Sequence, residues 1–256
     1  MNPFSCQAPD DVEIVGAVFS AIGAPRGTVV LCHGLPAGRP TSAEGAADDE
    51  GYPGLARRVA THGFHVAIFN FRGTGPSGGH LDIDLWPQDL VAVLDHLDTT
   101  PLHRPNYAVA GFSAGGAASI LAAENDRRID PLITFAAPAD YSFLPLATDA
   151  ESWFAFYRDL DMIRDGYPDD AAGWASRFAR MVPRDAIGNV HASRIVLIHG
   201  TADDVVPLSH LDALAAAAGD KAERIVLPGG IHQMRKDERA VSTLIKVLNQ
   251  SRPTEG

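Results

Sequence analysis

Cysteine is nearly absent from this sequence. Only Cys6 and Cys32 occur among its 256 residues, too few for a disulfide framework and too far apart for the close ligand spacing of a zinc site. His62 and His65 span a predicted helix–strand junction instead of one helical face, so they do not form a metal-binding pair. We therefore expect two buried thiols, no metal and no other cofactor.

Positive charge is also scarce. The chain has 21 Lys and Arg against 32 Asp and Glu residues, a net charge of −11 and a pI near 5.2, so nucleic acid and anionic membranes are not expected partners. Asp10, Asp11 and Glu13 occupy positions where a signal peptide would be hydrophobic. The uncharged run from Tyr107 to Ala123 is too short and too glycine-rich for a membrane span. We expect a cytoplasmic protein.

Internal repeats and low-complexity tracts are absent, and 46% of the residues are hydrophobic. This length and composition suit one α/β domain over residues 1–256. Apolar strand-like runs alternate with helical patterns, which predicts a mostly parallel sheet flanked by helices, with an antiparallel hairpin at its N-terminal edge. The predicted strands lie in 4–20 (the hairpin), 28–32, 64–70, 107–112, 131–136, 194–199 and 224–227.

Two segments interrupt this alternation. Residues 36–53 are rich in Gly, Pro, Ala and acidic residues, which indicates either the mobile rim of a site or an insertion. Residues 141–191 follow the sixth predicted strand and contain no buried-strand run, so we expect a small helical cap there. Most of the aromatic residues of the cap should seat it on the core, and a minority should face a ligand: Phe143, Trp153, Phe154, Phe156, Tyr157, Trp174 and Phe178.

A Gly-x-Ser-x-Gly turn at residues 111–115 joins an apolar strand to a helix of small residues. A serine in so sharp a turn needs glycine two positions before and after it, and its hydroxyl then stands clear of the backbone as a nucleophile. The amide of Ala114 points into the same space, as half of an oxyanion hole. By itself the pattern fits equally well a turn that only joins a buried strand to a helix.

Two further strands end in residues that a serine nucleophile would need. Asp203 and His232 each follow a predicted strand, which gives the chain order Ser, Asp, His. The imidazole would accept the serine proton, and the carboxylate would fix the tautomer of the imidazole. Two other acids remain open: Asp204 adjoins Asp203, and Asp140 ends the strand after the small-residue helix.

Four motifs at strand ends resemble those of the α/β-hydrolase superfamily over nearly the whole chain. They are His33-Gly34, Gly111-Phe-Ser-Ala-Gly115, His199-Gly-Thr-Ala-Asp203 with Val206-Pro207, and Gly230-Ile-His232. The resemblance implies Ser113 as nucleophile, Asp203 as orienting acid, His232 as base, and the amides of Leu35 and Ala114 as oxyanion donors. The chain is most similar to the small serine esterases and to the dienelactone-hydrolase-like group, whose typical cysteine nucleophile is replaced here by Ser113.

We therefore expect an enzyme, a serine hydrolase that cleaves a carboxylic ester of a small neutral or hydrophobic molecule through an acyl-enzyme on Ser113. Other acyl-transfer chemistry on the same residues is the nearer alternative, with an amide, a peptide or peroxide as the reactant. A fold that binds a small ligand without catalysis is the second alternative. A homo-oligomer is compatible with the sequence.

Overall fold

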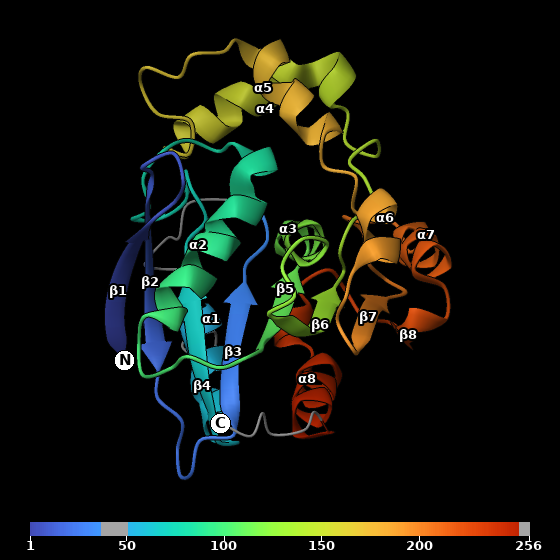
Figure 1. The fold of residues 1–256 in the computed structure, drawn as a ribbon. Helices are drawn as coiled ribbons and strands as arrows, with labels where there is room; N and C mark the ends of the chain where they lie inside the picture. Colours follow the sequence, from blue (N-terminus) through green and yellow to red (C-terminus); the bar gives the residue numbers. More distant parts are fainter. Residues whose placement is uncertain (37–50, 251–256) are drawn as a thin grey trace.

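A computed structural model describes residues 1–36 and 51–250. Within these ranges the chain builds an eight-stranded sheet in the order β1-β2-β4-β3-β5-β6-β7-β8, around which the helices are arranged (Figure 1). The hairpin β1–β2 and the pair β2–β4 are antiparallel, and every other pair is parallel. The strands are β1 Asn2–Gln7, β2 Glu13–Phe19, β3 Gly27–Cys32, β4 Phe64–Phe69, β5 Tyr107–Phe112, β6 Ile129–Phe135, β7 Ile195–Gly200 and β8 Ala222–Leu227.

Helices cover both faces of this sheet. Buried residues of α1 and α8 belong to the hydrophobic cluster on one face, and those of α2, α3 and α7 belong to the cluster on the other. The predicted α/β architecture is therefore confirmed. The helices are α1 Gly51–Ala60, α2 Trp86–Asp98, α3 Ala114–Ala123, α4 Leu146–Asp159, α5 Ala171–Ala179, α6 Pro183–Ala186, α7 Ser209–Ala218 and α8 Glu238–Gln250, with 3₁₀ turns η1 Ile83–Leu85, η2 Ile187–Asn189, η3 Gly219–Lys221 and η4 Met234–Lys236.

Strand β5 shows why the central strands are apolar throughout. Tyr107 and Val109 lie in one cluster, whereas Ala108, Ala110 and Phe112 lie in the other. Successive side chains of a strand point to opposite faces, so a strand covered by helices on both sides has no polar face. All six residues of β5 are buried. Packing on both faces therefore holds in place the end of the strand from which the next turn begins.

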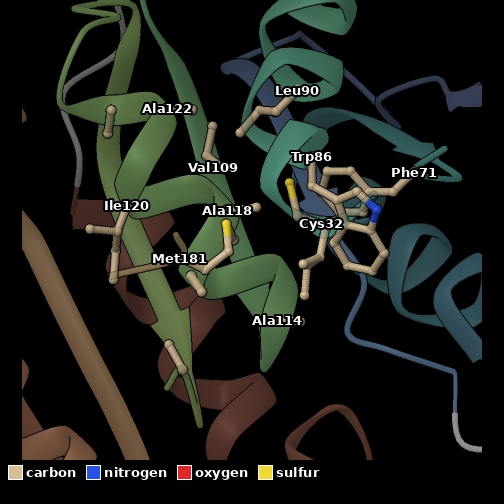
Figure 2. Close-up of a cluster of buried hydrophobic side chains, with 14 of the residues drawn as sticks. Cys32, Phe71, Trp86, Leu90, Val109, Ala114, Ala118, Ile120, Ala122 and Met181 are labelled. Atoms are coloured by element: carbon tan, nitrogen blue, oxygen red, sulfur yellow. The ribbon is translucent and has the colours of Figure 1, made fainter. Parts of the chain in front are cut away.

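Small residues of α3 bring that helix close to the sheet and to α2. Ala114, Ala118 and Ala122 lie in the cluster drawn in Figure 2, which also contains Cys32 at the end of β3. In the same cluster the indole of Trp86 stacks on the ring of Phe71, with 4.3 Å between ring centroids. Cys32 is buried as expected, whereas Cys6 on the edge strand is only partly buried. The cluster fixes α3 and the loop after β4 against each other.

Arg72, in the loop after β4, is held by a buried ion pair. Its side chain is 1% exposed, and its Nη2 lies 2.7 Å from Oδ1 of the fully buried Asp89. Its Nη1 lies 2.6 Å from Oδ2 of Asp10, whose side chain is 45% exposed. The backbone amide of Arg72 also donates to Asp89. These bonds hold in place the glycine-rich loop after β4, and this loop contacts the candidate site.

Substitution of Asp89 by Asn should destabilise the fold by about 3 kcal/mol, because the guanidinium of Arg72 would stay buried without its main counter-charge. Asp10→Asn is the matched control and should cost about 1 kcal/mol or less, since Asp10 is half exposed. Urea denaturation measures both free energies of unfolding. Equal losses for the two variants would show that Asp89 is not the main partner of Arg72.

Residues 141–191 divide between two locations. Helices α4 and α5 lie together at one end of the molecule (Figure 1), while α6 and η2 pack beside α3 and α7. Helix α5 is bound to η1 and the residues before it: Arg177 lies 3.0 Å from Asp82 and 3.4 Å from Asp84, and the indole N–H of Trp174 donates to the carbonyl of Leu81.

Two expectations from the sequence remain. The first is that residues 36–53 form the mobile rim of a site or an insertion, but most of that segment, 37–50, lies outside the described residues. The second concerns membrane spans. Among the helices of residues 1–36 and 51–250, none has the length and apolar character needed to cross a membrane.

Candidate active site

Ser113 occupies a strained turn between β5 and α3. Its backbone has φ 52° and ψ −123°, a conformation that a non-glycine residue adopts at a cost of about 1–3 kcal/mol. A Cβ atom on Gly111 would lie 2.6 Å from the carbonyl oxygen of Gly115, and one on Gly115 would overlap the carbonyl oxygen of His33. Both glycines are therefore needed for the close approach of the backbone, and the turn has the form predicted from the sequence.

The hydroxyl of Ser113 lies at one end of a chain of hydrogen bonds. Its Oγ is 3.0 Å from Nε2 of His232. On the other side of the ring, Nδ1 of His232 is 2.8 Å from Oδ2 and 3.0 Å from Oδ1 of Asp203. The side chain of Asp203 is fully buried, and that of His232 is 19% exposed. The loops after β5, β7 and β8 thus bring together three residues that lie far apart in the sequence.

The carboxylate of Asp203 is surrounded by donors. Its Oδ1 accepts the amide N–H groups of Val205 and Val206, at 2.9 and 2.8 Å. Its Oδ2 lies 3.2 Å from Nε2 of His199, a residue only 1% exposed. Burial alone would raise the pKa of Asp203, but the hydrogen bonds from His199, His232 and Val206 lower it well below its usual range. Asp203 is therefore an anion fixed in one orientation.

Neither rival acid is hydrogen-bonded to His232 in this way. Asp140 accepts from the amide of Ser142 and lies 2.6 Å from Nη1 of Arg184. Asp204 lies in the exposed part of the loop, at the wall of the cavity. Of the three acids weighed from the sequence, the structure brings Asp203 to the imidazole.

The predicted oxyanion donors lie on two sides of Ser113. A Cβ atom on Gly34 would be 2.9 Å from Cβ of Ser113, so the turn after β3 is in contact with the serine. Leu35 and Ala114 both line the cavity that contains Ser113.

His33 fixes the turn that carries Leu35. Its Nε2 accepts the amide N–H of Phe71 at 3.1 Å, so its Nδ1 carries the proton and donates to the carbonyl of Gly34 at 2.7 Å. Burial lowers the pKa of His33 to about 4, which keeps the ring neutral. Backbone groups therefore bind both ring nitrogens of this histidine.

A cavity of about 1370 Å³ opens on the hydroxyl of Ser113. One wall comes from α4 and the residues on either side of it, one from the loops of Asp203 and His232, and one from β2 and β4. Arg235 is the one Lys or Arg residue lining it among the described residues, and the guanidinium carbon of Arg235 lies 5.8 Å from the ring centre of Tyr52. The walls formed by residues 1–36 and 51–250 are mainly apolar and contain no cluster of Lys or Arg suited to a polyanion.

The aromatic residues of the segment 141–191 have two roles. Trp153, Phe156 and Tyr157 line the cavity, together with Tyr141 and Phe143. The others pack against one another at α4 and α5: Trp174 lies 5.8 Å from Phe154 and 5.1 Å from Phe178, measured between ring centroids.

The contact between His199 and Asp203 was not predicted from the sequence. Nε2 of His199 lies 2.9 Å from the carbonyl oxygen of Val206. The same nitrogen also faces the Asp203 carboxylate. The available signal in the sequence was that His199 and Asp203 are four residues apart across the turn. This spacing allows a contact, but it does not give the direction of either side chain.

Comparison with known proteins gives a consistent result for the fold. A family profile described as "alpha/beta hydrolase fold" matches residues 27–182. The hydrolase-fold protein GrgF from Penicillium sp. sh18 superposes with a TM-score of 0.74 at 15% identity, covering 99% of both chains. An esterase from Exiguobacterium antarcticum gives 0.71 at 18% identity, covering 98% of this chain and 100% of the esterase.

Another solved structure, a 2,6-dihydroxy-pseudo-oxynicotine hydrolase, gives a TM-score of 0.71 at 20% identity, over 99% of this chain and 70% of the other. A search of curated proteins finds no match. At these identities the structural likeness concerns the fold, and the chemistry has to be argued from the residues in the cavity.

Proposed function

Because the chain belongs to the alpha/beta hydrolase family, we propose that it is a serine hydrolase that cleaves a carboxylic ester of a small neutral or hydrophobic molecule. The single observation that carries the proposal is the hydrogen-bonded chain from Ser113 through His232 to Asp203, opening on a cavity. Backbone amides of Leu35 and Ala114 are proposed as the oxyanion donors.

The reaction follows from the placement of the protons. Oγ of Ser113 attacks the ester carbonyl carbon while Nε2 of His232 takes its proton, and the developing oxyanion is stabilised by backbone amides. The proton then passes to the leaving alcohol as the ester C–O bond breaks, which leaves an acyl group on Ser113. Water, deprotonated by His232, attacks the acyl carbon; the bond from this carbon to Oγ of Ser113 then breaks, His232 returns the proton to Oγ, and the acid is released. Asp203 keeps the proton of the neutral ring on Nδ1 throughout.

The cavity walls support a neutral substrate. We propose that residues 141–191 act as a cap, with Trp153, Phe156 and Tyr157 as apolar walls over Ser113. Because the cavity extends both beneath the cap and toward β2, it has room for the acyl part of an ester on one side of the serine and for the alcohol part on the other. Small aliphatic or aromatic esters fit this shape better than charged ones.

A series of p-nitrophenyl esters from acetate to palmitate tests this proposal. Each added methylene that is buried contributes at most about 0.8 kcal/mol, so kcat/KM should rise by up to about fourfold per carbon until the pocket is full. We expect the maximum at short to medium acyl chains, with aryl esters also accepted. A maximum at the longest chains would contradict the proposed size of the pocket.

Matched substrates separate the alternatives. Phosphate and choline esters should be poor substrates, since the walls are mainly apolar and Arg235 is the one Lys or Arg residue that lines the cavity among the described residues. Anilides of the preferred acyl group should react more slowly than the esters; the opposite ranking would make this protein an amidase or peptidase. Saturable ligand binding without turnover of any activated ester would show a binding protein instead.

A further inference from the structure

We infer that His199 is a positioning residue of this site, which holds the Asp203 carboxylate and moderates its interaction with His232. The catalytic part of this inference rests on the proposed serine hydrolase function. The observation that carries it is the buried contact of Nε2 of His199 with two oxygens, the carbonyl of Val206 at 2.9 Å and Oδ2 of Asp203 at 3.2 Å.

The surroundings of His199 fix its proton. Both neighbours of Nε2 are acceptors, so this nitrogen carries the hydrogen. In the part of the chain that the structure describes, Nδ1 of His199 is buried without a hydrogen-bond partner. A proton on Nδ1 would therefore be a buried donor without an acceptor, which is unfavourable. His199 is a neutral ring in the Nε2–H tautomer.

This tautomer secures Asp203 by two routes. The hydrogen on Nε2 partly neutralises Oδ2 directly, and it also binds the carbonyl of Val206, whose own amide donates to Oδ1 of Asp203. His199 and His232 are thus donors to the same carboxylate oxygen. Without His199, Oδ2 would carry more uncompensated charge and would hold the protonated form of His232 more strongly.

Other titratable groups near His199 belong to different elements. His210 on α7 interacts electrostatically with His199 and accepts the amide N–H of Ala139 through Nδ1. Asp140 and Arg184 in turn act on His210, with opposite signs. Burial lowers the pKa of His210. Asp203 remains the one charged group in direct contact with His199 among the described residues.

Two substitutions separate positioning from packing. His199→Leu removes the donor, and kcat/KM should fall about ten- to hundredfold, mainly through kcat. The acid limb of the kcat/KM profile should move to higher pH by about one unit, because His232 would release its proton less readily. His199→Gln has an amide that reaches both acceptors, and it should restore activity to within about threefold with the limb at its wild-type position.

The outcomes are distinct. A loss of kcat in His199→Leu with an unmoved acid limb, or a limb shifted to lower pH, would overturn the inference. So would a His199→Gln variant that is folded but as impaired as His199→Leu.

A measurement independent of turnover keeps the inference testable if His199→Leu does not fold or if the wild type hydrolyses no ester. Nitrogen-15 NMR of the histidine-labelled wild type should show His199 protonated at Nε2 and bare at Nδ1. A ring protonated at Nδ1 and bare at Nε2 would overturn it. Absence of turnover with the expected His199 spectrum would instead refute only the proposed hydrolase function.

Discussion

Replacement of Ser113 by Ala should reduce ester turnover by roughly 10⁶-fold, to the level of the residual catalysis that a site without its nucleophile retains. The reason is that no covalent acyl group can form, while His232 and Asp203 stay in place without a hydroxyl to deprotonate. Steady-state hydrolysis of the best p-nitrophenyl ester measures the loss. Alanine has a Cβ atom as serine does, so the backbone strain at φ 52° is the same in the variant and in the wild type. The variant should therefore remain folded with little change in its melting temperature.

A fluorophosphonate probe tests the same assignment by chemistry instead of by rate. It should label Ser113 alone, and mass spectrometry of the labelled peptide locates the adduct. Ser142→Ala is the matched control, because Ser142 is an exposed serine bonded to Asp140 and should leave labelling unchanged. Labelling of another serine, or equal labelling of Ser113→Ala, would refute Ser113 as the nucleophile.

The turn at Ser113 could be predicted from the sequence because its constraint is local. Gly111 and Gly115 leave room that no other residue would, and the apolar run before them marks a strand covered on both faces. The alternation of strands and helices likewise predicted the parallel sheet, and both this fold and the α/β-hydrolase resemblance are confirmed. Local sterics and periodicity therefore account for the part of the site that belongs to one strand–turn–helix unit.

The acid and its surroundings could not be predicted with the same certainty, because they depend on how side chains turn after separate strands meet. Asp140 and Asp203 both follow buried strands, but Asp203 is bonded to Nδ1 of His232, whereas Asp140 is bonded to Ser142 and Arg184. The contribution of β2 to the cavity was also missed, since an antiparallel hairpin at the sheet edge carries no catalytic pattern. Such contacts are tertiary, and no spacing in the chain encodes them.

Substitution of Asp203 by Asn should reduce kcat/KM by about 10⁴-fold, through the tautomer of His232. Oδ1 of Asp203 accepts two backbone amides, from Val205 and Val206, and these donors cannot reverse. The oxygen of the new side chain must therefore stay at that position, which forces its NH₂ group to where Oδ2 faces His232. The ring then has to accept at Nδ1 and carry its proton on Nε2, toward Ser113, where it can no longer act as a base.

Asp140→Asn and Asp204→Asn are the matched controls, since each removes one carboxylate from the neighbourhood of the site. Asp140 is paired with Arg184 and Asp204 is exposed, so each change should alter kcat/KM by less than about threefold. Melting temperatures of the three variants identify any loss that is due to unfolding. A larger effect of Asp140→Asn than of Asp203→Asn would place the orienting acid after β6. A folded Asp203→Asn variant with near wild-type kcat/KM would refute the role of the carboxylate, because the geometry leaves the amide no orientation that satisfies both His232 and the two backbone donors.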